Sequence, residues 1–161
     1  MRAEARLEEL SIVLPPVLKP VANYLGCKLL GDVLYVGGHG PVLADGSVIR
    51  GKVGSDVSLE EARRAARATA LSMLATVREA LGSLDRVSQI VKVFGMVNCG
   101  PGFNQTPAVI DGCSDVLVEI FGDAGRHTRS AVGLAELPFD ICVEIEMIAQ
   151  VVRGNDRPVS L

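Results

Sequence analysis

The sequence predicts an α+β domain in which two helices pack on one face of a mixed β-sheet, in the order β-β-β-α-β-α-β-β. Three observations lead to this class: short segments rich in β-branched residues, two longer segments with helical periodicity, and a composition that suits one aliphatic core. The chain has 161 residues, 48% of them hydrophobic and 22% charged, which excludes a disordered chain. Aromatic residues make up 4% and Trp is absent, so Val, Ile, Leu and Ala must build the core.

Strands dominate the expected structure of the first third of the chain. A short helical start and a lead-in marked by prolines come before them. The three expected strands are residues 22–30, 33–36 and 47–52. Gly31-Asp32 and Asp45-Gly46 supply the turns, because these residue types favour tight turns.

Two segments carry helix signals. Ser58 and Glu61 have capping-box spacing, and apolar residues then recur at helical intervals until Gly82, a natural C-cap. Many residues on the apolar face are alanines, so this helix can lie close to a sheet. Thr106-Pro107 is expected to be an N-cap followed by proline at the first helical position, which opens a second helix that ends near Gly122.

Three further strands are expected at residues 87–97, 129–134 and 141–152. Alternation along the last strand places four apolar residues on one face and a mixed set on the other. The apolar set is Val143, Ile145, Met147 and Ala149, and the mixed set is Cys142, Glu144, Glu146 and Ile148. A face with both apolar and acidic groups is typical of a subunit interface with polar pockets, so we expect a homo-oligomer.

Charge and targeting signals narrow the function classes. Sixteen Lys and Arg residues against nineteen Asp and Glu give a net charge of −3, which argues against a dedicated nucleic-acid binder. Residues 1–10 contain no apolar segment of the kind found in signal peptides, and no apolar run approaches the roughly 18 residues that a membrane span needs. We expect a cytoplasmic protein with no nucleic acid or membrane as partner.

The four cysteines and two histidines do not form a metal-binding pattern. Cys27, Cys99, Cys113 and Cys142 lack C-x-x-C spacing, and we expect them to be buried, reduced side chains rather than a disulfide framework. With only two histidines in the chain, we expect no multi-histidine metal site. The run Gly37-Gly38-His39-Gly40 superficially resembles an oxyanion-hole loop, but no serine elbow accompanies it, and it can equally be a turn at the end of a strand.

Arg129 and Glu144 are the strongest candidates for chemistry. Arg129 lies at the start of an expected strand, where a guanidinium can face a cleft and bind a planar carboxylate with two hydrogen bonds. Glu144, on a strand that we expect to be its neighbour, is a candidate acid, base or water-orienting group. The alternative is structural, since the two residues could form an ion pair or belong to a solvated edge.

The segment Arg129–Pro138, Arg-Ser-x-Val-x-x-Ala-x-Leu-Pro, followed by Val143-Glu144-Ile145, resembles the C-terminal signature of the RidA (YjgF) family. The likeness extends over residues 20–152 and includes Tyr24, the Gly37-Gly38 strand end and Phe103-Asn104. It implies a chorismate-mutase-like fold, a homotrimer and deaminase activity on enamines and imines. The whole chain, 1–161, is then one RidA-like domain, with residues 1–20 as extension and lead-in and residues 153–161 as a tail.

The resemblance also implies roles for individual residues. Arg129 matches the arginine that pairs with the substrate carboxylate, and Glu144 matches the glutamate that orients water or moves protons. The implied substrate-binding positions are Tyr24, Gly38, Asn104 and Ala131. The implied reaction is the hydrolysis of 2-aminoacrylate, 2-iminopropanoate or 2-iminobutanoate to a 2-keto acid and ammonia, which requires no cofactor.

Several positions depart from the deaminase pattern and suggest a divergent subfamily. Ala131 stands where a cysteine is common, Gly37 where serine or threonine is frequent, and His127 where a small residue or proline is usual. His127 and His39 either line the pocket or belong to turns. Two other functions are considered: a carboxylate-binding or regulatory module without catalysis, and the ribonuclease activity once attached to the family name, which the net charge disfavours.

Overall fold

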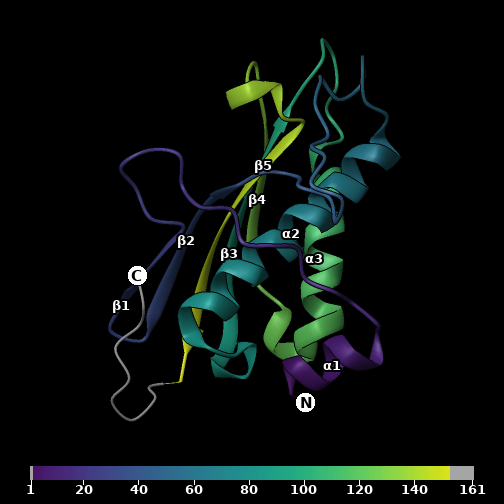
Figure 1. Ribbon diagram of the computed structural model, residues 1–161. Coiled ribbons are helices and arrows are strands. Elements are labelled where there is room, and N and C mark those ends of the chain that lie inside the picture. The colour runs from purple at the N-terminus through teal and green to yellow at the C-terminus, as the bar shows by residue number, and fades with distance from the viewer. Residues whose placement is uncertain (1, 153–161) are drawn as a thin grey trace.

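The computed structural model describes residues 2–152, which fold as an α+β domain with five strands and three α-helices in the described range (Figure 1). The helices are α1 (Ala3–Glu9), α2 (Leu59–Leu81) and α3 (Thr106–Phe121). The strands are β1 (Cys27–Leu30), β2 (Val33–His39), β3 (Val87–Asn98), β4 (Thr128–Leu134) and β5 (Val143–Val151). The expected tail at residues 153–161 lies outside the described residues.

The strands form one mixed sheet in the order β1-β2-β5-β3-β4. Every neighbouring pair is antiparallel except β3 and β4, which run parallel because α3 carries the chain back between them. One expectation is therefore wrong: the strands of Arg129 and Glu144 are not neighbours, since β3 lies between β4 and β5. The sequence order of strands says nothing of their spatial order when a late strand inserts into the middle of a sheet.

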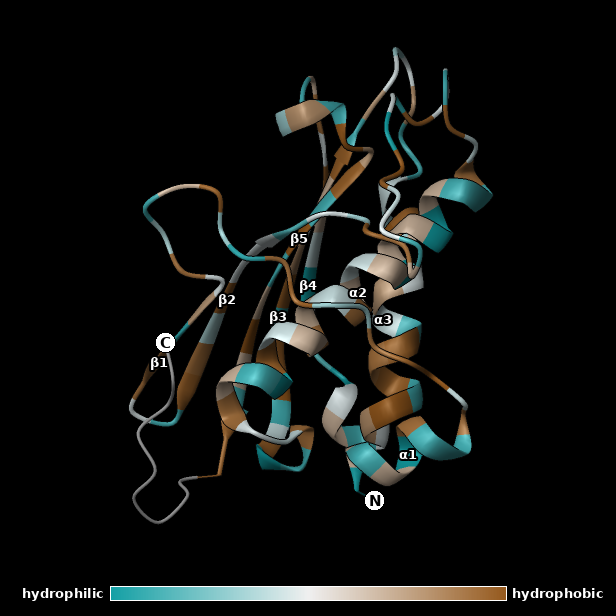
Figure 2. Cartoon of the chain, viewed as in Figure 1, coloured by the Kyte–Doolittle hydropathy of each residue, from teal (hydrophilic) through white to brown (hydrophobic). Residues whose placement is uncertain are grey.

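Helices α2 and α3 lie side by side on one face of the sheet, as expected (Figure 1). The capping box of Ser58 and Glu61 is present, and Gly82 ends α2 in the left-handed conformation, with φ at 81°. Hydrophobic residues line most of α3 (Figure 2). At Gly112 the two helices approach so closely that a Cβ atom would lie 2.0 Å from the Arg63 carbonyl oxygen. The small residues of both helices therefore allow this packing.

The two faces of the sheet differ as the alternation in the last strand predicts. Val143, Ile145, Met147 and Ala149 are buried beneath the helices. No helix of the described chain covers the opposite face, which carries apolar residues together with acidic ones. The residues on it include Tyr35, Phe94, Met96, Glu144, Glu146 and Ile148. The use of this face as a subunit interface stays a prediction.

Two expected strands are wrong in whole or in part. Residues 47–52 form no strand, and only isolated bridges join Val48 to Val42 and Arg50 to Ile141. Gly51 and Gly54 adopt positive φ angles of 108° and 90°, which stop an extended chain from continuing. Residues 22–24 and 26 are bends and Leu25 is irregular, so the expected strand at 22–30 shortens to β1.

The start of α3 also differs from the expectation. Gln105 occupies the N-cap position and makes no side-chain capping bond. Thr106 lies inside the helix, where its hydroxyl donates instead to the Ala131 carbonyl oxygen at 3.0 Å. This contact anchors α3 to β4, so the side chain that looks like a cap in the sequence connects two elements.

All four cysteines are free thiols, and Cys27, Cys113 and Cys142 are buried, as expected. Cys99 is only partly buried. Over the described residues, no helix combines the length and the apolar character needed to cross a membrane.

Candidate functional site

Arg129 lies on the edge strand β4, where its side chain turns toward α3. Its Nη1 atom donates to Oδ1 of Asp111 at 2.8 Å and to Oγ of Ser114 at 3.0 Å. The Arg129 side chain is 23% exposed and that of Asp111 is 43% exposed, so the ion pair is partly open to solvent. Both acceptors come from the same face of α3, three residues apart, which is one helical turn.

One edge of the Arg129 guanidinium has no partner among the residues that the structure describes. The two protons of Nη1 are used by Asp111 and Ser114, and no acceptor within residues 2–152 takes a proton from Nε or Nη2. Nε and Nη2 form the planar fork that binds a carboxylate with two parallel hydrogen bonds. Arg129 is therefore held on one side and still able to take a carboxylate on the other.

His127 is connected to Arg129 through Ser114, which contacts both residues. Its Nε2 atom lies 3.0 Å from Oγ of Ser114, and its Nδ1 atom lies 2.7 Å from the Gly125 carbonyl oxygen. Burial lowers the pKa of His127, and the charge of Arg129 lowers it further. Of the two sequence interpretations, the structure supports neither alone, because His127 ends a turn and contacts Arg129 through Ser114.

Glu144 lies on the uncovered face of the sheet, beside a bulge in β2. The pairing of β2 with β5 shifts register between Val36 and His39, and the two intervening residues are Gly37 and Gly38. The Glu144 carboxylate fills the space where a side chain at position 38 would be: a Cβ on Gly38 would lie 2.0 Å from Oε1. Burial raises the pKa of Glu144, and the charge of Glu146 raises it further. A carboxylate of raised pKa is a better general base near neutral pH.

His39 is half-buried and lies between β2 and α2. Its Nε2 atom lies 2.8 Å from Oγ1 of Thr76, and its Nδ1 atom lies 2.8 Å from the Gly37 carbonyl oxygen. Burial lowers the pKa of His39, which favours the neutral ring. In the neutral ring Nδ1 then donates its proton to the Gly37 carbonyl oxygen, so Nε2 accepts from the hydroxyl of Thr76.

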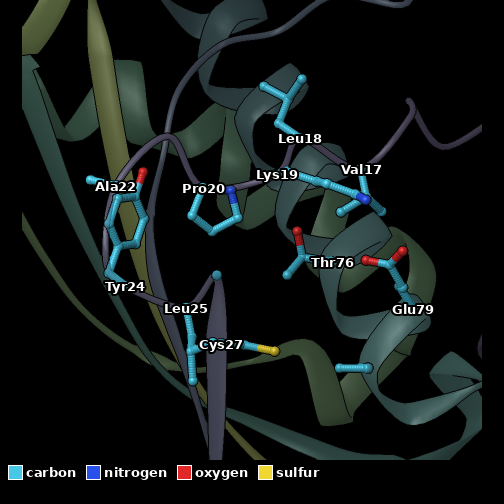
Figure 3. Close-up of a pocket in the computed structure, with 12 residues that line it drawn as sticks. Val17, Leu18, Lys19, Pro20, Ala22, Tyr24, Leu25, Cys27, Thr76 and Glu79 are labelled. Carbon is cyan, nitrogen blue, oxygen red and sulfur yellow. The ribbon is translucent and has the colours of Figure 1, made fainter. Parts of the chain in front are cut away.

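Two cavities lie beneath residues 17–26, the segment that precedes β1. One, of about 320 Å³, contains Glu144, Gly38, His39 and Tyr24 among its lining residues. The other, of about 340 Å³, lies between this segment and α2, with Thr76 and Tyr24 in its wall (Figure 3). Tyr24 lines both cavities, and the residue is 56% exposed.

Asn104 and Ala131 line an open hollow of about 560 Å³ over the edge strand β4. Ala131 is two residues from Arg129 on the same strand, so both side chains point to the same face. A thiol is present in this hollow although position 131 lacks one, because Cys99 lines it too. Burial raises the pKa of Cys99, so this thiol is not an activated nucleophile.

The predicted site residues thus form two separate groups, one around Arg129 and one around Glu144. The Arg129 half-site consists of Arg129, Ala131, Asn104 and His127. The Glu144 half-site consists of Glu144, Gly38, His39 and Tyr24. Arg129 pairs in register with Val93, which is fully buried under the helices, whereas Glu144 follows the helix-facing Val143 and points the other way. The alternative of an Arg129–Glu144 ion pair is wrong, since the partner of Arg129 is Asp111.

Residues 4–151 match the protein family described as "YjgF/chorismate_mutase-like, putative endoribonuclease". The chain belongs to this family. Protein TCP17 of Trypanosoma cruzi is 38% identical over 151 residues, which cover 93% of this chain and 94% of TCP17. Both the family resemblance seen in the sequence and the expected fold class are therefore confirmed.

Two solved structures of high similarity resemble this YjgF-like chain over nearly its whole length. Atu1372 of Agrobacterium tumefaciens is 38% identical with a TM-score of 0.85, covering 93% of this chain and 92% of its own. A "putative endoribonuclease" of Shewanella oneidensis is 31% identical with a TM-score of 0.89, covering 94% of this chain and all of its own.

Sequence reasoning missed Asp111 and Ser114, the residues of this YjgF-like chain that hold Arg129. A signal for them exists, because polar residues are few along α3. Asp115 and Glu119 pair with arginines of α2, at 2.6 and 2.9 Å. Asp111 lies one turn before Asp115 but has Arg129 as its partner, and Ser114 accepts from the same arginine. Within residues 2–152, no three His, Cys, Asp or Glu side chains cluster in a way that could hold a metal ion.

Proposed function

We propose that this protein is a hydrolase that deaminates small 2-imino and enamino acids, of the 2-aminoacrylate, 2-iminopropanoate and 2-iminobutanoate type, without a cofactor. The observation that carries the proposal is the free Nε–Nη2 edge of Arg129, since a fork held in place on its other side is suited to a substrate carboxylate. Membership of the YjgF family supports it, because the family includes imine deaminases.

The reaction needs few groups. An imine carbon is electrophilic, so holding the carboxylate on Arg129 and directing a water at that carbon supplies most of the catalysis. Glu144 takes a proton from the attacking water as the new C–O bond forms and returns it to the nitrogen. The hydroxyl proton of the resulting carbinolamine then passes through Glu144 to the leaving nitrogen as the C–N bond breaks and the C=O bond forms, which releases ammonia and leaves a 2-keto acid. An enamine substrate first gains a proton on carbon to become the imine.

We infer that one complete site draws on two copies of the chain. Arg129 and Glu144 lie on opposite faces of the sheet, and β3 lies between their strands. The uncovered sheet face bears Glu144 together with apolar residues. A homotrimer with clefts between subunits brings the Arg129 half-site of one subunit to the Glu144 half-site of the next. Tyr24, Gly38, Asn104 and Ala131 would line that cleft around the substrate.

A second candidate function is binding without catalysis, as a carboxylate-sensing or regulatory member of the family. Asp111 favours this second function, because its negative charge neutralises part of the charge of the Arg129 guanidinium. Ala131 favours it too, because deaminases commonly have a cysteine at this position. Tight binding of 2-oxobutanoate with no imine turnover would support this function. In both cases the proposed location is the cytoplasm and neither nucleic acid nor membrane is a partner.

The test is imine hydrolysis in a coupled assay. An amino-acid oxidase or a threonine dehydratase generates the imine, and ammonia release is measured above the spontaneous rate. Wild type, Arg129→Ala, Glu144→Gln and the matched control Arg126→Ala are compared. Arg126 is exposed and, within residues 2–152, its side chain pairs only with Asp123 three residues away, so its loss should leave the rate unchanged. Loss of activity in the first two variants supports the proposal, whereas an active Arg129→Ala overturns it.

A further inference from the structure

The surroundings of Arg129 form a continuous chain of donors and acceptors. Nδ1 of His127 faces the Gly125 carbonyl oxygen, so Nδ1 carries the proton. In the neutral ring Nε2 is then an acceptor, and the Ser114 hydroxyl proton satisfies it. With its proton so directed, the Ser114 oxygen presents a lone pair to Nη1 of Arg129. Each proton in this series of hydrogen bonds therefore has a single acceptor.

The turn that carries His127 is itself fixed against α3. A Cβ atom at Gly125 would lie 2.3 Å from the Leu117 carbonyl oxygen, so the turn packs directly on the helix backbone. His127 thus meets Ser114 at the end of a short, tightly packed connection between α3 and β4. The charged group that faces His127 is Arg129, and both this charge and burial favour the neutral ring that the chain of bonds requires.

We propose that His127 and Ser114 are positioning residues for Arg129, which lock Nη1 against α3 and leave the Nε–Nη2 edge presented to an incoming carboxylate. Asp111 supplies the second, charged contact to the same nitrogen. An arginine side chain has many rotamers, and fixing it before the ligand arrives removes that ordering cost from binding. The carboxylate ligand in this inference rests on the proposed function, whereas the locking of the guanidinium does not.

The first experiment measures the guanidinium directly. Nuclear magnetic resonance of protein labelled at the arginine nitrogens resolves Nη protons only for a guanidinium whose rotation is restricted. Wild type should show such signals for Arg129, assigned by their absence in Arg129→Ala. Ser114→Ala and His127→Leu should each lose or broaden them, and His127→Gln should keep them, because its amide oxygen can accept from Ser114. Asp115→Asn, on the same helix, is the matched control and should change nothing.

The second experiment measures binding of 2-oxobutanoate by calorimetry. Ser114→Ala and His127→Leu should each weaken binding about tenfold, the size expected for a lost hydrogen bond to a charged group. Because His127 acts through Ser114, the double variant should be no weaker than Ser114→Ala alone. In turnover, KM should rise while kcat stays within about twofold, since Arg129 binds the substrate before and during the reaction.

Unchanged Arg129 signals in Ser114→Ala, or additive losses of binding in the double variant, overturn the inference. So does a drop in melting temperature with the dissociation constant unaltered, because a purely structural role predicts that result. Failure of the proposed function has a different signature. In that case 2-oxobutanoate binds Arg129→Ala as well as wild type, while the resonance experiment still decides whether His127 and Ser114 hold the arginine.

Discussion

The carboxylate of Glu144 occupies the space that any side chain on Gly38 would need, with a Cβ at position 38 only 2.0 Å from Oε1. The bulge in β2 brings the two residues together, because its extra residue presents the backbone of Gly38 toward β5. A glycine in this strand end is therefore a requirement of the Glu144 side-chain position. The run Gly37-Gly38-His39-Gly40 superficially resembles an oxyanion-hole loop, but this steric requirement is a simpler explanation for Gly38.

The Gly38→Ala variant should lose imine hydrolysis while it keeps the fold. The methyl group displaces the carboxylate by an ångström or more, and a misplacement of that size costs about a hundredfold in rate. The matched control is Gly37→Ala, whose Cβ would meet nothing closer than 3.6 Å. Steady-state rates of both variants, with circular dichroism as the check on folding, measure the difference. Equal rates for both would show that the Glu144 position does not matter.

The acid limb of the pH–rate profile should shift to lower pH in Glu146→Gln. Burial and the charge of Glu146 raise the pKa of Glu144, so in wild type the active carboxylate forms at a higher pH than that of an ordinary glutamate. Removing the charge of Glu146 takes away repulsion between the two carboxylates and lowers the pKa of Glu144. Activity at acidic pH should rise relative to that at pH 8. A profile that stays unchanged would mean that Glu144 ionisation does not limit the rate.

The same raised pKa has a consequence for stability. A carboxyl group whose pKa is higher in the folded than in the unfolded state favours folding at low pH, and this contribution is lost as pH rises through the folded pKa. Glu144→Gln should therefore raise the melting temperature at pH 8 relative to wild type and lose this advantage near pH 4. Thermal unfolding at equal protein concentrations measures it. A lowered melting temperature at pH 8 would contradict the direction.

Gly112→Ala should destabilise the fold without acting on the site chemistry. The added methyl would lie 2.0 Å from the Arg63 carbonyl oxygen, so α2 and α3 must separate. Overpacking of this kind costs about 1–3 kcal/mol of unfolding free energy. Chemical denaturation followed by circular dichroism measures this loss, with Gly37→Ala as the tolerated control. An unchanged midpoint would show that the helices can shift apart freely.

The sequence supports much of the fold because its strongest signals are local. The capping box at Ser58, the glycine at position 82 and the alternation in β5 all depend on neighbours along the chain, and the structure has each of them. The wrong strand at residues 47–52 follows from the backbone of Gly51 and Gly54, whose positive φ angles no residue pattern announces.

The site was harder to predict, because its geometry depends on strand order. Arg129 and Glu144 are both visible in the sequence as candidates. In the structure β5 inserts between β2 and β3, and Arg129 and Glu144 lie two strands apart and on opposite faces. This arrangement is a property of the whole sheet. The partners of Arg129 were missed for the same reason: Asp111 and Ser114 precede it by 18 and 15 residues and meet it only once α3 packs on β4.

We propose that Arg129 of one subunit and Glu144 of another act on the same substrate. Co-expression of Arg129→Ala and Glu144→Gln chains tests it most directly, since each variant alone should be inactive. In randomly mixed ring-shaped oligomers, roughly a quarter of the clefts pair an intact arginine with an intact glutamate across the interface. We expect imine hydrolysis at about that fraction of the wild-type rate. Mixed oligomers that show no activity above either parent would contradict it.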